Sequence, residues 1–236
     1  MQKTAFGTFS IDQSGRSFLV WTTVSLLFLG GVALLWFVNQ PAYIWLGTED
    51  SWGENLTAVF YLIAGILLLA HVLHRSKSDF PGKQKLLTVL LGLFFLWMAG
   101  EEISWGQRIF GFGTPESMMS ANVQKEFNVH NLQPLSGPTA WVDPHRLFSI
   151  FMLLNGILLP LAYRFWTAAR RLMNKISFPV VPLSCVGFFV VGLVHSPLIA
   201  NIDNHWAHSE VQELIFSAGF LAGCISIYQG RNRLPS

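Results

Sequence analysis

The sequence predicts an all-α fold, a polytopic membrane helical bundle of about six transmembrane helices with one further amphipathic helix at the membrane surface. Of its 236 residues, 52% are apolar and only 12% are charged, a balance typical of proteins that have lipid as their solvent. Six stretches are apolar over about 20 residues, the length needed to cross about 30 Å of hydrocarbon. Within a single integral membrane domain of residues 1–236, these spans lie near residues 18–38, 56–73, 86–103, 147–165, 179–200 and 211–228.

The first two spans have simple flanks. The apolar run near residues 18–38 follows a polar lead-in and is longer than a signal-peptide core of about 7 to 15 residues, so we expect a retained helix. The second span, near residues 56–73, runs into His74 and Arg75, an ordinary cytoplasmic anchor.

The basic residues predict the orientation. With six spans, all but three of the 15 Lys and Arg residues fall on one side of the membrane, and the exceptions are Arg108, Lys125 and Arg146. Cytoplasmic flanks of membrane helices are rich in Lys and Arg. We therefore expect a multi-pass protein of the inner (plasma) membrane with its N-terminus and its C-terminus both in the cytoplasm.

The third span, near residues 86–103, ends in the polar sequence GEEISWGQR. If the helix continues, Glu101, Ser104 or Trp105, and Arg108 share one face, while Glu102 points about 100° away. One interpretation is an interfacial border with paired charges. The other is a catalytic site in which Glu101 or Glu102 is the general acid or base and Arg108 binds an anionic headgroup. Ser104, Trp105 and Gln107 would then contact the substrate.

The next segment predicts an interfacial helix near residues 115–131. Thr114 suits an N-cap, and Met119, Val123 and Phe127 recur every four residues. Glu126 and His130 are also four apart, so they could orient one another or share a metal, or simply form a solvated polar face. Asn131 ends the segment and joins Glu126 as a candidate substrate-binding residue.

The fourth span, near residues 147–165, ends at basic residues that begin with Arg164. Small residues on the sixth span permit close helix packing.

The segment that joins the fifth and sixth spans contains the densest group of potential metal ligands. Between the fifth and sixth spans lie His195, Asp203, His205 and His208. Imidazole and carboxylate are the ligands that zinc and similar divalent ions favour, although interfacial histidines also serve as hydrogen-bonding groups. With His130, these residues form the predicted metal set.

Counting from the basic anchors places Glu101, His145, His195 and Glu213 about 24 to 30 Å across the membrane. A charge that faces lipid at that depth is unfavourable, so these groups should face each other, a cavity or water. We therefore expect the acids, the imidazoles and Arg108 to meet in one pocket near the outer headgroups.

The blocks GEEISWGQRIFG and NVQKEFNVHN together resemble a pattern in uncharacterised bacterial multi-pass membrane proteins. There an EExSWGQR block precedes an NxQxExNxHN block. The resemblance covers the third span and the segment after it and implies no activity. It implies that the residues of the two blocks belong together: Glu101, Glu102, Ser104, Trp105, Gln107, Arg108, Glu126, His130 and Asn131.

Two functions fit these observations. The chain could be a metal-dependent hydrolase or transferase acting on a lipid or lipid-linked substrate, with a divalent metal such as zinc as cofactor. It could instead be a non-catalytic membrane subunit or small transport component whose polar cluster is structural. The expected partners are membrane lipid and a lipid-linked substrate, and the chain could also form a homo-oligomer or join a membrane complex. Nucleic acid is not expected as a partner, and the sequence has no phosphate loop or nucleotide fingerprint.

Overall fold

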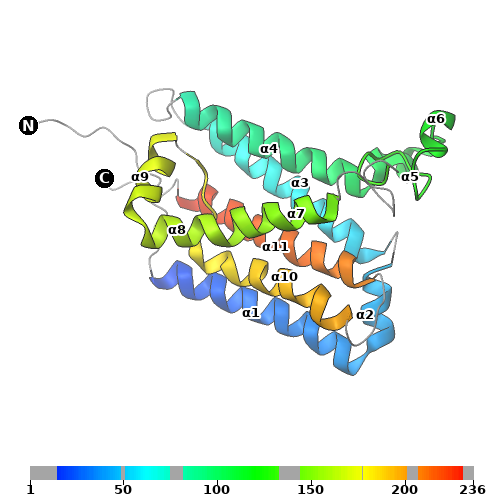
Figure 1. Ribbon diagram of the computed structural model, residues 1–236, viewed down its shortest axis with the longest axis horizontal. Helices are drawn as coiled ribbons and strands as arrows, with labels where there is room; N and C mark the ends of the chain where they lie inside the picture. The colour runs from blue at the N-terminus through cyan, green and yellow to red at the C-terminus, as the bar shows by residue number, and fades with distance from the viewer. Residues whose placement is uncertain are drawn as a thin grey trace, which may run out of the picture.

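The computed structural model describes residues 15–48, 51–74, 82–132, 144–176, 178–200 and 207–230, which form a helical bundle without a β-strand in these ranges (Figure 1). Two 3-10 turns, Ser104–Gly106 and Leu183–Cys185, and a π-helical turn, Leu153–Leu158, interrupt or join the helices. The α-helices are α1 (Gly15–Val38), α2 (Gln40–Leu46), α3 (Trp52–Leu73), α4 (Gly82–Glu102), α5 (Gln107–Phe110), α6 (Glu116–Met119), α7 (Pro144–Met152), α8 (Leu159–Phe165), α9 (Thr167–Ile176), α10 (Val186–Ala200) and α11 (Ala207–Gly230).

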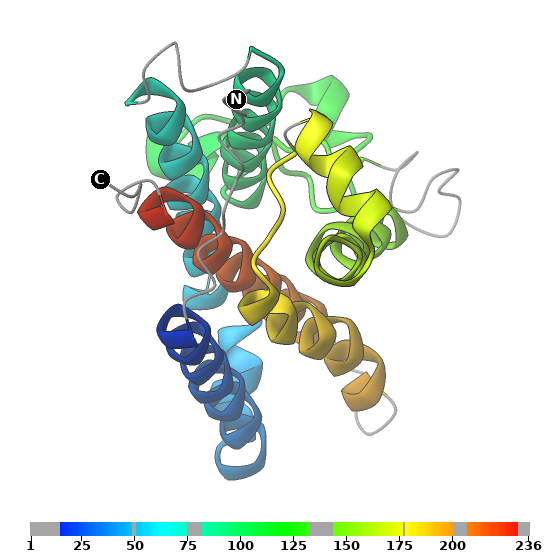
Figure 2. The ribbon, with the colours of Figure 1, turned by 90° about the vertical axis from the view of Figure 1, so that its left-hand side faces the viewer.

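Helix α11 is the centre of the bundle. It packs against α3 and α10, and α3 in turn packs along α4. Figure 2 shows α11 passing between the side formed by α1 and α2 and the side formed by α3 and α4. In its most apolar window, 61% of the α11 residues are buried, against 17% for α1. The central position of α11 brings its side chains within reach of most other helices.

Aromatic rings fill the core around α11. Phe220 of α11 lies 4.9 Å, between ring centroids, from both Phe95 of α4 and Phe189 of α10. Phe216 is stacked with Phe189 and is fully buried. Rigid aromatic packing of this kind fixes the positions of α4, α10 and α11 relative to one another, because close-packed interiors leave side chains little freedom.

The spans predicted from the sequence coincide with helices, but not all of them are long enough to cross a membrane. Among the described residues, four helical segments are long and apolar enough by length and composition: Leu19–Val38, Trp52–Leu73, Leu147–Phe165 and Ala207–Gln229. Helix α4 counts as a fifth only if it is taken together with the helical turns after it, from which it is bent by 68°. The predicted span near residues 179–200 begins as extended chain, because Pro179 and Pro182 lack the N–H that a helix needs, and its apolar helical part is shorter. Six spans therefore remain a prediction.

The interfacial helix predicted near residues 115–131 was wrong. The structure has only the single turn α6, preceded by Pro115 as N-cap, followed by a compact loop. The Asn122 side chain accepts hydrogen bonds from the backbone N–H of Gln124 and Glu126, and Lys125 has a left-handed φ of 60°. Asparagine side chains that bond the nearby backbone compete with helix formation, and here they prevail over the apolar period of four.

The two ends of the bundle differ in charge. The first turn of α1, the last turn of α11 and the basic helix α9 lie at one end, whereas α2, α5 and α6 lie at the other (Figure 1). Helix α9 carries Arg170, Arg171 and Lys175. The C-terminal end of α4 brings Glu101 and Glu102 to the opposite end.

Gly156, which has no side chain, allows α10 to pack closely against the π-helical turn. A Cβ at this position would lie 2.1 Å from Cγ of Phe189, whose ring is fully buried and held between Phe216 and Phe220. We expect Gly156→Ala to destabilise the protein by about 1 to 3 kcal/mol, because the ring has no room to move. Thermal unfolding in detergent measures this effect.

Gly187→Ala is the matched control. It adds the same methyl group to α10, where nothing lies within 4 Å of the new Cβ. Equal unfolding temperatures for the two variants would show that α10 does not approach Gly156 closely.

Candidate functional site

Helix α4 ends in a left-handed turn that reverses the chain. Ser104, Trp105 and Gly106 have φ values of 46°, 54° and 78°, and the helix does not continue to Arg108. Two of these residues carry a Cβ, and a left-handed conformation costs such a residue about 1 to 2 kcal/mol. Contacts elsewhere must therefore hold the turn.

The first such contact is made by Trp105, which folds back over the end of α4. Its Nε1–H donates to Oε1 of Glu101 at 2.8 Å. Its ring lies against Gly100, where a Cβ would come within 2.9 Å of a ring carbon. The absence of a side chain at Gly100 and the carboxylate at Glu101 together fix the position of the indole.

The second contact is made by the other oxygen of Glu101, which binds the loop of residues 112–132. Oε2 accepts hydrogen bonds from the backbone N–H of Val129 at 2.7 Å and of His130 at 3.0 Å. Nδ1 of His130 lies 3.2 Å from the same oxygen. A carboxylate that is only 2% exposed needs such donors, because an uncompensated buried charge is very unfavourable. Glu101 therefore attaches loop 112–132 to α4.

Further polar contacts join the same two segments. The Ser104 hydroxyl donates to Glu126 at 2.6 Å, and Asn128 donates to both of these side chains. The Gln107 side chain donates to Thr114 and accepts from the backbone N–H of Phe127. Residues of both sequence blocks thus form one network.

Arg108 and Asn131 complete this network at its edges. The guanidinium of Arg108 lies 3.0 Å from Glu126 of the loop and 3.2 Å from Glu54 of α3. The Asn131 amide donates to the Gln124 side chain within the loop, and the Asn131 carbonyl accepts from the N–H of Val123. Both residues stabilise loop 112–132 and its attachment to the bundle.

A cavity of about 350 Å³ lies beside this network, between α4, α7 and α11. Its walls are apolar and mainly aromatic, whereas one polar end is made by three carboxyl groups and an imidazole. The walls are formed by Phe94, Trp97, Met98, Leu147, Phe148 and Phe151, and the polar end by Glu101, Glu102, His130 and Glu213.

Glu102 differs from its neighbour, because it faces α11 rather than the loop. It is 8% exposed, and its carboxyl group is hydrogen-bonded to that of Glu213. Such a bond requires that one of the two groups carries a proton, since two carboxylates in contact repel each other. Glu54 and Glu210 add to the negative field at Glu102. The structure thus brings together a proton-sharing pair at the cavity.

The predicted metal ligands are divided between two places. His130 belongs to the Glu101 network, whereas His195 and His208 both contact the buried hydroxyl of Tyr43 in α2, at 2.6 Å from Nε2 and 3.1 Å from Nδ1. A tyrosine hydroxyl has one proton to donate and lone pairs to accept, so it joins the two imidazoles. Burial raises the pKa of Tyr43, which keeps that proton in place.

Within the described ranges, no three His, Cys, Asp or Glu side chains could hold a metal ion together. The predicted ligands Asp203 and His205 lie outside the described residues. In the described part of the chain, three of the expected acids and one imidazole, Glu101, Glu102, Glu213 and His130, line one cavity, whereas His195 and His208 contact Tyr43 instead.

Sequence reasoning did not assign a role to Tyr43, Glu54 or Glu213. The sequence predicted a similar membrane depth for Glu213 and Glu101, but nothing in the sequence indicated that Glu213 pairs with Glu102. Tyr43 follows Asn39 and Pro41, an N-cap and a first-turn proline, which are ordinary signals of a helix start that could have revealed α2.

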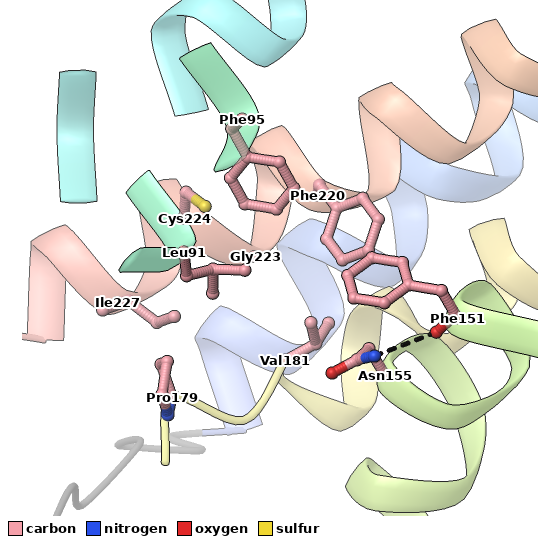
Figure 3. A pocket seen from close by; sticks show the side chains of 10 residues that line it. All are labelled: Leu91, Phe95, Phe151, Asn155, Pro179, Val181, Phe220, Gly223, Cys224 and Ile227. Carbon is pink, nitrogen blue, oxygen red and sulfur yellow. Dashed lines mark hydrogen bonds between the residues drawn. The ribbon is translucent and has the colours of Figure 1, made fainter. Parts of the chain in front are cut away.

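A second hollow, of about 10 Å³, is too small for a substrate and has room for about one water molecule. Figure 3 shows its aromatic walls, Phe95, Phe151 and Phe220, and the Asn155 amide donating to the Phe151 carbonyl at 3.0 Å. The polar group is thus bonded to its own helix, and this hollow belongs to the core.

No protein-family model, curated protein or solved structure matches this chain. An activity therefore has to be inferred from the geometry of the site.

Removing the carboxylate of Glu101 should release loop 112–132. In Glu101→Ala, the N–H groups of Val129 and His130 lose their acceptor, a loss of about 1 to 3 kcal/mol, so their amide exchange should accelerate about 10- to 100-fold. Hydrogen exchange with mass spectrometry checks this. Glu116→Ala, at an exposed acid, should change nothing; unchanged protection in both variants would show that Glu101 does not hold the loop.

Proposed function

We propose that this chain is an integral membrane protein that binds a lipid or lipid-linked substrate in the cavity between α4, α7 and α11. It acts there as a hydrolase or transferase, with Glu102 and Glu213 as the acid and base. The observation that carries the proposal is the pair formed by the buried carboxyl group of Glu102 and the half-buried one of Glu213 at the polar end of an aromatic cavity.

The outer surface supports the membrane setting. Large apolar side chains are exposed along the bundle, among them Leu27 and Phe37 of α1 at 72% and 79% and Leu73 of α3 at 80%. Exposed apolar surface on this scale is unfavourable in water and suits contact with lipid. In this setting, the end with α9 faces the cytoplasm of an inner-membrane protein, and the cavity lies near the outer leaflet.

The mouth of the cavity supports a lipid substrate. Trp97 and Leu147 line the cavity and are also 39% and 55% exposed, so the cavity opens onto the apolar surface of the bundle. A substrate with an alkyl chain enters such an opening directly from the bilayer. The alkyl chain then contacts the aromatic walls while the polar group reaches Glu102.

The chemistry follows from the shared proton. The ionised carboxyl group takes a proton from the attacking nucleophile, and the protonated one gives its proton to the leaving group. Glu101 has a different role, because both of its oxygens bind the indole and the loop. Arg108, Ser104, Gln107, Glu126 and Asn131 likewise position the loop in this proposal.

A divalent metal remains a prediction for the segment that contains Asp203 and His205, and no step of the proposal depends on it. The alternative function is a non-catalytic membrane subunit. The many bonds within the Glu101 network favour a structural role for that network. The two functions differ in what they require of Glu102 and Glu213.

The topology can be tested by cysteine labelling in intact cells. We expect Glu116→Cys to react with a membrane-impermeant maleimide added from outside, and Lys175→Cys to react only after the cells are permeabilised. The native Cys185 and Cys224 are buried and should stay unlabelled. Labelling of both variants from outside would contradict the proposed orientation.

The activity can be tested by comparing the lipids of cells with and without the protein. We expect a lipid species to change in abundance with the wild-type protein, and turnover to fall by at least about 100-fold in Glu102→Gln and in Glu213→Gln. Glu116→Gln is the control and should behave as wild type. Full activity in both cavity variants, with unfolding temperatures unchanged, would leave the structural role as the better explanation.

A further inference from the structure

The charge at the polar end of the cavity bears on the kind of headgroup it accepts. A carboxyl pair that shares one proton keeps one negative charge, and Glu54 and Glu210 add to the field at Glu102. The charge of Glu101 is compensated by the indole N–H, two backbone N–H groups and His130. Among the described residues at this end of the cavity, the charge without a donor set of this kind is that of Glu102 and Glu213.

Among the described residues that line this cavity, there is no arginine or lysine. The nearest arginine in sequence to the pair, Arg108, is bound between Glu54 and Glu126 and does not line the cavity. Phosphate and sulfate groups are usually bound by Arg, Lys or several backbone N–H groups. At this cavity an anionic head would instead meet the charge of the Glu102 and Glu213 pair.

The walls suit a cation as well as an alkyl chain. Phe94, Trp97, Phe148 and Phe151 present aromatic rings around a volume of about 350 Å³. An ammonium group is attracted to the face of an aromatic ring, most strongly to that of Trp. The volume is at the lower end of the range for small-molecule sites, about 300 to 1,000 Å³, and therefore fits one alkyl chain better than a whole diacyl lipid.

We infer that the cavity selects a single-chain amphiphile whose polar head carries a positively charged amine, in preference to one with a phosphate or sulfate head. This inference rests on the proposed function, whose substrate class it narrows. The ammonium N–H groups donate to Glu102 and Glu213, the alkyl chain packs on the aromatic walls, and like-charge repulsion excludes the anionic heads. It replaces the anionic headgroup that the sequence had suggested for Arg108.

Three photoreactive amphiphiles with the same straight alkyl chain test the inference: a primary amine, an alcohol and a monophosphate. Each is cross-linked at neutral pH to the purified full-length protein in a nonionic detergent, and the labelled peptides are mapped by mass spectrometry. We expect α4 and α7 peptides to be labelled by the amine at a concentration about tenfold lower than by the alcohol, and least by the phosphate. An excess of the non-photoreactive amine should suppress the labelling.

Glutamine variants separate this inference from the proposed activity. Glu102→Gln replaces one carboxyl group by a neutral amide and leaves the charge of Glu213, so it should lose turnover but keep the preference for the amine. The double variant Glu102→Gln/Glu213→Gln removes the charge, and the amine should then bind no better than the alcohol. Glu116→Gln should keep the wild-type ranking.

The outcomes distinguish the two ideas. Equal labelling by all three compounds, or strongest labelling by the phosphate, would overturn the amine preference while leaving the cavity as a lipid site. Labelling of α4 and α7 by none of them would overturn the proposed function together with the inference. The ranking on the wild-type protein decides the matter even where the double variant fails to fold.

Discussion

The structure at the end of the bundle that holds α5 and α6 depends on the buried carboxylate of Glu101. A charge in that position needs donors, and the chain supplies them from two directions, the Trp105 indole that returns from the left-handed turn and the backbone N–H groups of Val129 and His130. The same bonds stabilise an unfavourable backbone at Ser104 and Trp105 and attach loop 112–132. Without the carboxylate, the Trp105 indole and the N–H groups of Val129 and His130 lose their acceptor.

The two adjacent glutamates face different parts of the structure because of the geometry of the helix. Neighbouring residues on an α-helix point about 100° apart, so Glu101 faces the loop while Glu102 faces α11. Both oxygens of the Glu101 carboxylate accept hydrogen bonds, whereas the Glu102 carboxyl group shares a proton with that of Glu213. The two neighbouring residues therefore have different surroundings: Glu101 attaches the loop, and Glu102 is the residue that transfers a proton in the proposed function.

The parts that could be predicted from sequence are those set by local composition. Apolar runs of about 20 residues identified the helices, and the doubled glutamates marked the polar end of α4, because these signals depend on neighbours in the chain. The loop after α6 could not be predicted from the period of Met119, Val123 and Phe127, since Asn122 and Asn128 bond each other and the backbone instead. The pairing of Glu102 with Glu213, and of Tyr43 with two histidines, depends on the rotation of whole helices about their axes, which packing of the aromatic core decides.

The Glu101 network also fixes one edge of the cavity beside Glu102. His130 belongs to loop 112–132, which the bonds to Glu101 and Gln107 hold in place, and its side chain at the polar end of the cavity is 41% exposed. Trp97 and Leu147, on the apolar walls, are also partly exposed. The cavity is therefore open at both its polar and its apolar part. In the proposed function, the alkyl chain of a substrate enters past Trp97 and Leu147, while its polar head lies at the end that His130 borders.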